Sequence, residues 1–291
     1  MNSYGAQDMV SALARVMMHE PGAAMANADP DVWHYAGELD GDLLVRQHRA
    51  FAGIVESSGA EIEWLSPSAD GLADAVFTHD PSLVTDEGAI LLHMGKPLRR
   101  GETQAHRDYY ERADVPVLGI IEAPGMVEAG DCLWLNSRTL AVGRGFRTND
   151  AGIGQLRHLL APLEVDVLCF DLPMYTGPDA CLHLMSIISL LDHDLALIYE
   201  PLFPVGLFQV LQDLGVRMVA APVEEFEASN GLNLNVLALA PRHGVMIAGY
   251  PGTEAALTSA GCRIETFDGA ELCVKCEGGP TCLTRPVLRR V

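Results

Sequence analysis

The sequence predicts one closed α/β domain in which a unit of about fifty residues recurs along the whole chain. Three observations carry this prediction. Short apolar strands return at a nearly constant interval, a helical segment follows each of them, and polar residues precede the units at a common phase. A repeat of this length is typical of units that are stacked or arranged radially, each burying its apolar face against its neighbours.

Four apolar segments mark the repeated strand most clearly. Their starts lie 51, 55 and 50 residues apart, and turn-forming residues precede each one. They are residues 89–92, 140–143, 195–198 and 245–248. Each follows another short apolar segment, so we expect a unit to begin with two strands joined by a short turn.

Helices and third strands complete the units. Helical spacing of apolar residues and good helix formers predict helices at residues 42–57, 102–113, 150–160, 206–214 and 253–259. Third strands are predicted at residues 62–65, 115–121, 165–170, 216–221 and 263–267. The first unit begins with a strand at residues 15–18 and has no leading strand of its own. We expect the segment after Cys282 to supply it, which joins the two ends of the chain in one ring.

The length allows one or two domains, but the repeat runs through the chain, so we expect a single domain, residues 1–291, with no internal linker. The chain is 49% hydrophobic and 20% charged, as compact globular proteins are. Its net charge of −20 opposes binding to nucleic acid and to anionic membranes. No secretory pattern is readable in residues 1–16, no apolar run reaches about eighteen residues, and the seven cysteines are an odd number. We therefore expect a soluble cytoplasmic protein with no nucleic-acid or membrane partner.

One segment departs from the repeat. Residues 22–41 are rich in Ala, Asn, Asp and Pro and are predicted to form a long loop that contains Trp33 and Tyr35. Two interpretations stay open: a lid over a site, or a surface excursion packed by its own aromatic side chains.

Polar residues occupy the same position in successive units. They are Asp80, Asp131, His183, Asn233 and Cys282, at intervals of 51, 52, 50 and 49 residues. Taken singly, each has an ordinary explanation as a turn former, a core histidine or a buried thiol. These separate explanations do not account for their common position in the repeat. If the units surround an axis, equivalent strand ends converge, and these side chains converge with them.

A thiol, an imidazole and carboxylates gathered at one point predict a defined chemistry. A thiolate attacks a trigonal, electron-poor carbon, and a histidine protonates the leaving group and then activates water. Carboxylates hold a planar cation through charge-assisted hydrogen bonds. They also raise the pKa of a nearby thiol, so Cys282 is expected to stay protonated until a cation arrives. Guanidinium is the cation that also offers a trigonal carbon and an amine leaving group.

Four motifs resemble those of the guanidino-modifying enzymes: arginine deiminases, dimethylarginine dimethylaminohydrolases and amidinotransferases. Residues 128–131 (Glu-Ala-Gly-Asp) and 141–149 resemble the Glu-x-Gly-Asp and Gly-x-Ser-x-Arg-Thr-Asn signatures. Residues 74–80, with Arg-Arg-Gly-Glu at 99–102, resemble the dimethylargininase pattern. Leu-His-Leu around His183 and Gly-Pro-Thr-Cys-Leu around Cys282 resemble the histidine and nucleophile segments. The resemblance follows nearly the whole chain in order. It implies the pentein fold, a five-bladed α/β-propeller of pseudo-symmetric ββαβ repeats.

The resemblance also implies roles for the converging residues. Cys282 is the expected nucleophile and His183 the general acid and base, with Glu128 as the third member of the catalytic set. Glu128 and Asp80 would hold the guanidinium, and Asp131 is placed with the substrate-binding residues. The reaction would pass through an amidino group on Cys282, which water resolves to a ureido product and a free amine. No metal and no organic cofactor is implied.

The remaining substrate-binding residues are assigned to the other end of the substrate. Asp74 is expected to contact its amino-acid end. Arg147, together with Arg99 or Arg100, would bind a carboxylate, a task that suits the forked guanidinium group. His79 replaces the glutamate that the dimethylargininase pattern carries beside its aspartate, which changes recognition of the amino group or of the guanidinium.

A second departure narrows the expected reaction. Met185 stands where deiminases and amidinotransferases carry the aspartate of His-x-Asp. The absence of this aspartate makes the chain more similar to the dimethylargininases, whose substrates carry methylated nitrogens. We therefore expect a dimethylargininase-type hydrolase of arginine or N-methylated arginine. The alternative is an arginine deiminase or a hydrolase of another small guanidino compound.

Further alternatives stay open. An amidinotransferase would use the same thiol, although the missing aspartate disfavours it. A non-catalytic propeller, like the translation factor that keeps ribosomal subunits apart, is disfavoured by the retained thiol, histidine and carboxylates. Cys273 and Cys276 could join Cys282 in a zinc or redox site, but a single C-x-x-C pair is weak evidence. The other cysteines, at positions 132, 169, 181 and 262, are expected core thiols. Whether the chain forms a homodimer is left open.

Overall fold

The computed structural model describes residues 3–65, 69–177 and 182–290. Within these ranges the strands form five separate three-stranded sheets, and helices connect strands of the same sheet, so the fold is mixed α/β. In each sheet the middle strand pairs antiparallel with one neighbour and parallel with the other. The parallel pair requires a crossover, which explains why each unit of the sequence contains a helix.

Four sheets are each built from one continuous stretch of chain. In spatial order they are β3 (Ser82–Thr85), β4 (Gly88–Leu91) and β5 (Val117–Ile120); β6 (Cys132–Asn136), β7 (Thr139–Arg144) and β8 (Asp166–Asp171); β9 (Ile188–Asp192), β10 (Leu195–Ile198) and β11 (Arg217–Ala220); and β12 (Leu237–Ala240), β13 (His243–Ile247) and β14 (Arg263–Phe267). The predicted second and third strands are thus confirmed in all four.

The fifth sheet joins the two ends of the chain. Its middle strand, β1 (Ala12–Met18), pairs parallel with β2 (Glu61–Trp64) and antiparallel with the last strand, β15 (Arg285–Arg290). Val16 lies opposite Pro286 in that register. The prediction that the segment after Cys282 supplies the missing leading strand is confirmed.

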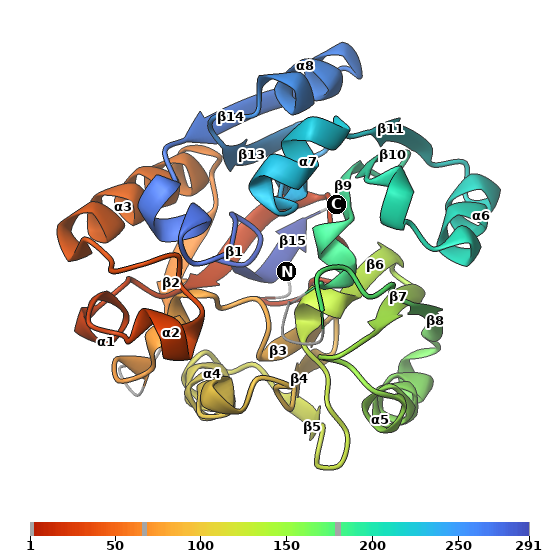
Figure 1. Cartoon of the computed structure of the whole chain (residues 1–291). Coiled ribbons are helices and arrows are strands. Elements are labelled where there is room, and N and C mark those ends of the chain that lie inside the picture. Colours follow the sequence, from red (N-terminus) through yellow and green to blue (C-terminus); the bar gives the residue numbers. More distant parts are fainter. Residues whose placement is uncertain (1–2, 66–68, 178–181, 291) are drawn as a thin grey trace.

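The predicted helices are also confirmed, within one or two residues at their ends. They are α3 (Gly41–Ser57), α4 (Glu102–Arg112), α5 (Asp150–Leu160), α6 (Val205–Asp213) and α8 (Pro251–Ser259). Side chains cap two of them: Asp40 accepts from Leu43 N at 3.0 Å, and Asn149 accepts from Gly152 N at 2.9 Å. Figure 1 shows the five sheets around a common centre, with these helices at the outside.

Burial explains the regularity of the repeat. The middle strands β4, β7, β10 and β13 are buried along most of their length. Ile90 of β4, Val142 of β7 and Ile153 of α5 belong to one buried cluster, so neighbouring units share their core. Each such side chain contributes about 1.5–3 kcal/mol when removed from water. Apolar residues must therefore recur wherever a unit meets the next one.

The segment 22–41 differs from the predicted loop. It contains two short helices, α1 (Ala23–Ala26) and α2 (Pro30–Trp33). Asp29 caps the second through Asp31 N at 3.0 Å, and Pro30 occupies its first turn. A further helix, α7 (Val223–Ser229), was not predicted. Its Phe226 stacks on Tyr199 with ring centroids 3.5 Å apart, so tertiary packing stabilises a helix of only seven residues.

Short 3₁₀ turns bring the beginnings of the units together. One such turn lies immediately before, or at most a few residues before, the first strand of three units. They are η4 (Ala129–Asp131) before β6, η6 (Leu184–Ser186) before β9, and η8 (Leu232–Leu234) before β12. The first packs against the second, and the second against the third. Residues just before the first strand of successive units therefore lie close to one another.

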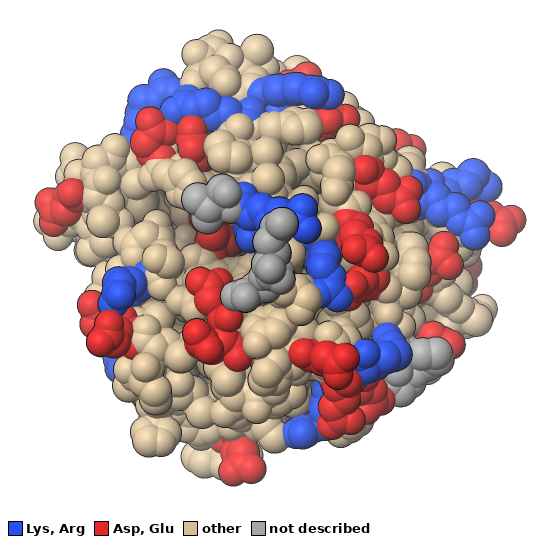
Figure 2. Space-filling view, turned by 180° about the vertical axis from the view of Figure 1, so that it is seen from behind, with Lys and Arg blue, Asp and Glu red and all other residues tan. Residues whose placement is uncertain are grey.

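The surface carries charges of both signs. On the face opposite to that of Figure 1, acidic and basic side chains are interspersed (Figure 2). Among the helices in the described parts of the chain, none has the length and apolar composition needed to cross a bilayer.

Candidate active site

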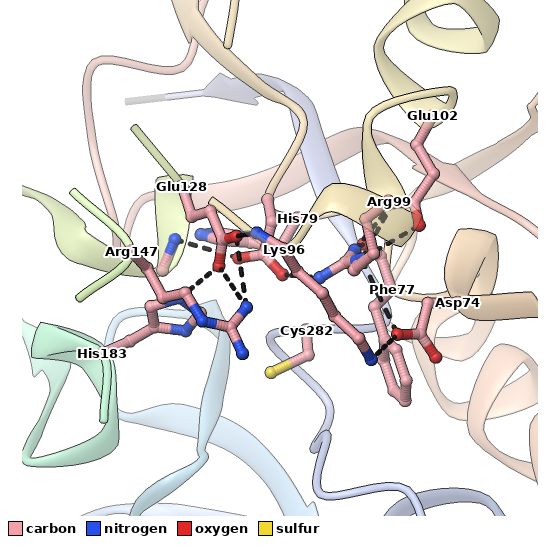
Figure 3. A network of polar contacts seen from close by, with 12 residues as sticks. Asp74, Phe77, His79, Lys96, Arg99, Glu102, Glu128, Arg147, His183 and Cys282 are labelled. Atoms are coloured by element: carbon pink, nitrogen blue, oxygen red, sulfur yellow. Dashed lines mark hydrogen bonds and ion pairs between the residues drawn. The ribbon is translucent and has the colours of Figure 1, made fainter. Parts of the chain in front are cut away.

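A cavity of about 120 Å³ opens where the units meet. Six of the residues predicted for the site line it: Asp74, Asp80, Arg99, Arg147, His183 and Cys282. They come from segments that are up to about two hundred residues apart in the sequence. Figure 3 shows the side chains of Asp74, Arg99, Arg147 and His183 around Cys282.

Two glycines hold the chain before Cys282 in place. A Cβ on Gly278 would lie 2.2 Å from the ring of Phe77, and a Cβ on Gly279 would lie 2.4 Å from Asn235 Cγ. Only glycine allows this close approach. Asn235 also accepts from Thr281 N at 2.9 Å and donates through Nδ2 to Cys282 Sγ at 3.1 Å. The backbone and Asn235 together fix the position of the thiol.

Burial raises the pKa of the Cys282 thiol, and the negative charge of Asp80 raises it further. The hydrogen bond from Asn235 acts in the opposite direction but does not outweigh them. A thiol with a raised pKa is protonated at neutral pH.

Glu128 lies behind the cavity wall and links two of its residues. Its carboxylate has no exposed surface and accepts from His183 Nε2 at 2.8 Å and from Arg147 Nη1 at 3.2 Å. It also accepts from the backbone N–H of Lys96 at 3.0 Å. Burial by itself raises the pKa of Glu128, but the hydrogen bond and charge of His183, with the charge of Arg147, lower it below its usual value. The carboxylate is therefore ionised and orients the histidine ring.

Arg99 is buried among acidic partners. Its Nη1 donates to Asp80 Oδ2 at 2.7 Å, its Nη2 donates to Glu102 Oε2 at 2.8 Å, and the same nitrogen donates to Phe77 O at 2.9 Å. The other oxygen of Asp80 accepts from Gly130 N at 3.0 Å. Burial raises the pKa of Asp80, but the charge of Arg99 outweighs this effect and lowers it. The Arg99 side chain is thus already used to hold Asp80 in the cavity wall.

Asp74 forms a second charged group together with a residue that was not predicted, Lys96. Lys96 Nζ donates to Asp74 Oδ2 at 2.8 Å and to Trp33 O at 3.1 Å, and the Tyr35 hydroxyl donates to Asp74 Oδ1 at 2.6 Å. The ammonium also lies 4.9 Å from the centre of the Trp33 ring. A signal for Lys96 was present in the sequence, because it lies three residues before Arg99 in the same turn.

Three predicted substrate-binding residues are absent from the described lining of this cavity: His79, Arg100 and Asp131. His79 is buried, donates from Nδ1 to Thr284 O at 3.0 Å, and has its pKa lowered to about 3 by burial. Asp131 accepts from Leu184 N at 2.9 Å, and burial raises its pKa to about 6. Arg100 is exposed and donates to Met94 O at 3.3 Å. A role of these three residues in substrate binding therefore stays a prediction.

In the fourth unit, the repeat predicted that the side chain of Asn233 would reach the centre, and this prediction is wrong. Asn233 is fully buried and donates to Thr253 Oγ1 at 3.0 Å, whereas Asn235, two residues later, reaches the cavity. The turn η8 around Asn233 changes which side chain faces the centre. A fixed interval in the sequence does not predict the local direction of a side chain within such a turn.

The cysteines are arranged in different environments. Cys276 lines the cavity, while Cys273 is buried in the neighbouring core. Within the described ranges no group of three or more His, Cys, Asp or Glu side chains is placed to hold a metal ion. Cys132 and Cys262 are buried and Cys169 is half-buried. The predicted core thiol at position 181 lies outside the described residues.

Comparisons with known proteins show a family and several relatives of the chain. A family model described as arginine deiminase matches residues 64–210. The N(G),N(G)-dimethylarginine dimethylaminohydrolase of Pseudomonas aeruginosa is 29% identical over 250 residues, covering 86% of this chain and 91% of that one. The enzyme of the same name from Streptomyces coelicolor is 29% identical over 242 residues, covering 82% and 86%.

The fold is similar to that of a solved structure. The crystal structure of a dimethylarginine dimethylaminohydrolase adduct with 4-chloro-2-hydroxymethylpyridine superposes with a TM-score of 0.76 at 26% identity. The match covers 96% of this chain and all of that one. Because the arginine deiminase model spans half of the sequence, the chain belongs to the arginine deiminase family of guanidino-modifying enzymes.

Proposed function

We propose that the protein is a thiol-dependent hydrolase that acts on the guanidinium carbon of arginine or an N-methylated arginine, as a dimethylargininase does. One observation carries the proposal: His183, joined at 2.8 Å to the buried Glu128, and the Cys282 thiol border the same cavity. A nucleophile, a proton carrier and an anion for the substrate cation are then within one small volume.

The reaction would proceed in two balanced steps. Cys282 passes its proton to His183 as Sγ attacks the guanidinium carbon, and the substituted amine leaves with that proton. His183 then removes a proton from water, which attacks the amidino carbon. The carbon–sulfur bond breaks, His183 returns the proton to the sulfur, and the products are a ureido compound and the free thiol. Glu128 holds the imidazole in place and stabilises its protonated form, because its carboxylate is ionised.

The raised pKa of Cys282 fits this sequence of events. In the free enzyme the thiol is neutral, which protects it from unwanted reactions. A bound guanidinium adds a positive charge beside the sulfur and favours the thiolate. Substrate binding would therefore switch on the nucleophile.

The relatives named dimethylarginine dimethylaminohydrolase support a methylated substrate. The family model named arginine deiminase favours plain arginine as the second candidate. Met185 supports the first, because it replaces the aspartate of the deiminase pattern and does not line the cavity as described.

We further propose that residues 1–291 form one five-bladed α/β-propeller of closed ββαβ units. A circuit of hydrogen bonds between successive units supports closure. Its members are Gly130 N to Asp80 Oδ1, Leu184 N to Asp131 Oδ1, Ser189 Oγ to Leu234 O, Thr281 N to Asn235 Oδ1 and His79 N to Cys282 O. Such a ring would hold the thiol, the histidine and the carboxylates of different units at one centre.

Mass-spectrometric detection of the ureido product and of the released amine tests the function. The substrates are arginine, mono- and dimethylarginine, agmatine and shorter guanidino acids, with Cys282→Ser as the control. Citrulline and methylated amine from a methylated arginine would support the dimethylargininase assignment, and ammonia from arginine would shift it to deiminase. Turnover that persists in the Cys282→Ser variant would overturn the thiol mechanism.

A further inference from the structure

The cavity has two charged ends, and the Lys96–Asp74 pair forms one of them. In the view of Figure 3, Glu128 and His183 lie on one side of Cys282 and the pair lies on the other. If Glu128 receives the guanidinium, as the proposed function requires, the pair faces the opposite end of the substrate. Its charges then decide which tail the substrate can carry.

The negative charge of Asp74 is already paired in the free protein. Its two oxygens accept from Tyr35 at 2.6 Å and from Lys96 at 2.8 Å, and the residue is only 4% exposed. One ammonium already neutralises its charge. A second ammonium placed beside it would face Lys96 Nζ across a poorly solvated cavity, where repulsion between like charges is weakly screened.

The other acidic side chains of the described lining do not replace Asp74. Asp80 is paired with Arg99 at 2.7 Å. Glu277 is exposed and accepts from Asn230 Nδ2 at 3.2 Å, so its charge is screened by solvent. The tail end of the cavity therefore offers no unpaired, buried negative charge among the described residues.

Lys96 instead offers a positive charge, and one N–H group of its ammonium has no partner among the described residues. An ammonium group has three N–H donors, and two of them are used by Asp74 and by the Trp33 carbonyl. The Trp33 ring stabilises the cation from the side. The side chain is 14% exposed and lines the cavity, so the third donor is available to an anionic oxygen of a ligand.

We propose that Lys96 selects a guanidino acid whose carboxylate binds the lysine and which carries no ammonium group beside that carboxylate. This inference rests on the proposed function and refines it. The reaction at the guanidinium carbon is unchanged, but arginine-type α-amino acids are replaced by ω-guanidino carboxylates as the preferred substrates.

The test compares three compounds that differ only at the tail: guanidinovalerate (arginine without its α-amino group), arginine itself, and agmatine (arginine without its carboxylate). Their tails carry a carboxylate alone, a carboxylate with an ammonium, and an ammonium alone. For the wild type we expect guanidinovalerate to exceed arginine in kcat/KM by about ten- to a hundredfold, the size of one charge-assisted hydrogen bond. Agmatine, whose tail is a cation, should be the poorest substrate of the three.

Two variants separate recognition from folding. Lys96→Met keeps the length of the side chain, leaves the backbone N–H on Glu128 and frees Asp74. In this variant we expect guanidinovalerate to show a higher KM, and arginine and agmatine to show increased kcat/KM values. Lys96→Arg keeps the charge and should restore the preference for the carboxylate. A wild-type preference for arginine, or an equal loss of activity toward all three compounds in Lys96→Met, would overturn the inference.

An error in the proposed hydrolase function can be distinguished from an error in the proposed role of Lys96. If no guanidine yields a product that depends on Cys282, the hydrolase assignment is wrong. Calorimetric titration of the three compounds into the Cys282→Ser protein still tests the subsite. Tighter binding of guanidinovalerate than of arginine, lost in the Cys282→Ser/Lys96→Met double variant, supports the role of Lys96. Equal binding of both compounds contradicts it.

Discussion

Arg147 Nη1 lies 3.2 Å from each carboxylate oxygen of Glu128. The protein thus places a guanidinium group of its own on the carboxylate that is proposed to hold the guanidinium of the substrate. The Arg147 side chain is 18% exposed and borders the cavity, so we expect that a substrate guanidinium can compete with it for Glu128. A substrate would displace it, and the released cation would then be able to meet the carboxylate of the substrate.

Replacing Arg147 by alanine is expected to affect two kinds of substrate in opposite directions. For agmatine, which has no carboxylate, KM should fall because the competitor for Glu128 is removed. For a substrate with a carboxylate, KM should rise by about tenfold, because a charged hydrogen bond is lost. Steady-state kinetics on both compounds check this. A parallel rise in both KM values would contradict the displacement of Arg147 by the substrate.

The Cys282 thiol of the free enzyme should be slow to alkylate at neutral pH. Burial and the charge of Asp80 raise its pKa, so the thiolate fraction is small and increases with pH. Asp80→Asn removes one of these causes and lowers the pKa, so alkylation by iodoacetamide at a fixed pH should become faster.

Peptide mass spectrometry of the alkylated protein identifies the modified residue. The Cys282→Ser variant is the control, because Cys276 lines the same cavity. An unchanged or slower reaction of Cys282 in Asp80→Asn would show that the charge of Asp80 does not govern the thiol.

Glu128 should make the stability of the protein depend on pH in the acid range. Its pKa is lower in the folded protein than the usual value of 4.5, because His183 and Arg147 outweigh the effect of burial. A lowered pKa stabilises the folded state above the usual pKa, and this contribution is lost as the pH falls toward the folded value. The free energy of unfolding of the wild type should therefore exceed that of Glu128→Gln by more at pH 7 than at pH 3.

Urea denaturation of both proteins at the two pH values measures this difference. Gln keeps the shape of the side chain and cannot ionise. A difference between the two proteins that does not depend on pH would exclude the ionised carboxylate as its cause.

Gly279→Ala should destabilise the protein and abolish activity. The new Cβ would lie 2.4 Å from Asn235 Cγ, and relieving this overlap moves either the loop that carries Cys282 or its hydrogen-bond partner. We expect a loss of about 1–3 kcal/mol in the free energy of unfolding. Gly154→Ala is a matched control in helix α5, where a Cβ meets nothing within 4 Å. It should stabilise the protein by up to about 1 kcal/mol. Equal effects of the two substitutions in urea denaturation would contradict the packing argument.

Much of the fold was predictable because its cause is local and periodic. A strand buried on both faces must be apolar along its length, and this requirement recurs in β4, β7, β10 and β13. The parallel third strand demands a crossover helix at the same interval. Cys282, His183 and Asp80 share the phase of this repeat, whereas Asp74 was predicted only from the resemblance of residues 74–80 to the dimethylargininase pattern.

The tertiary structure alone decided how these residues meet. It directed Asn235 instead of Asn233 to the thiol, brought Trp33 beside Lys96, and placed Arg147 on Glu128. These contacts join side chains that are separated by 19 to 63 residues, and they depend on the small rotations of a turn and on the packing of one unit against another. Periodicity in the sequence records which residues are buried, because burial acts on each residue separately. It does not specify which partner a buried charge will contact, because that partner depends on how the units pack against one another.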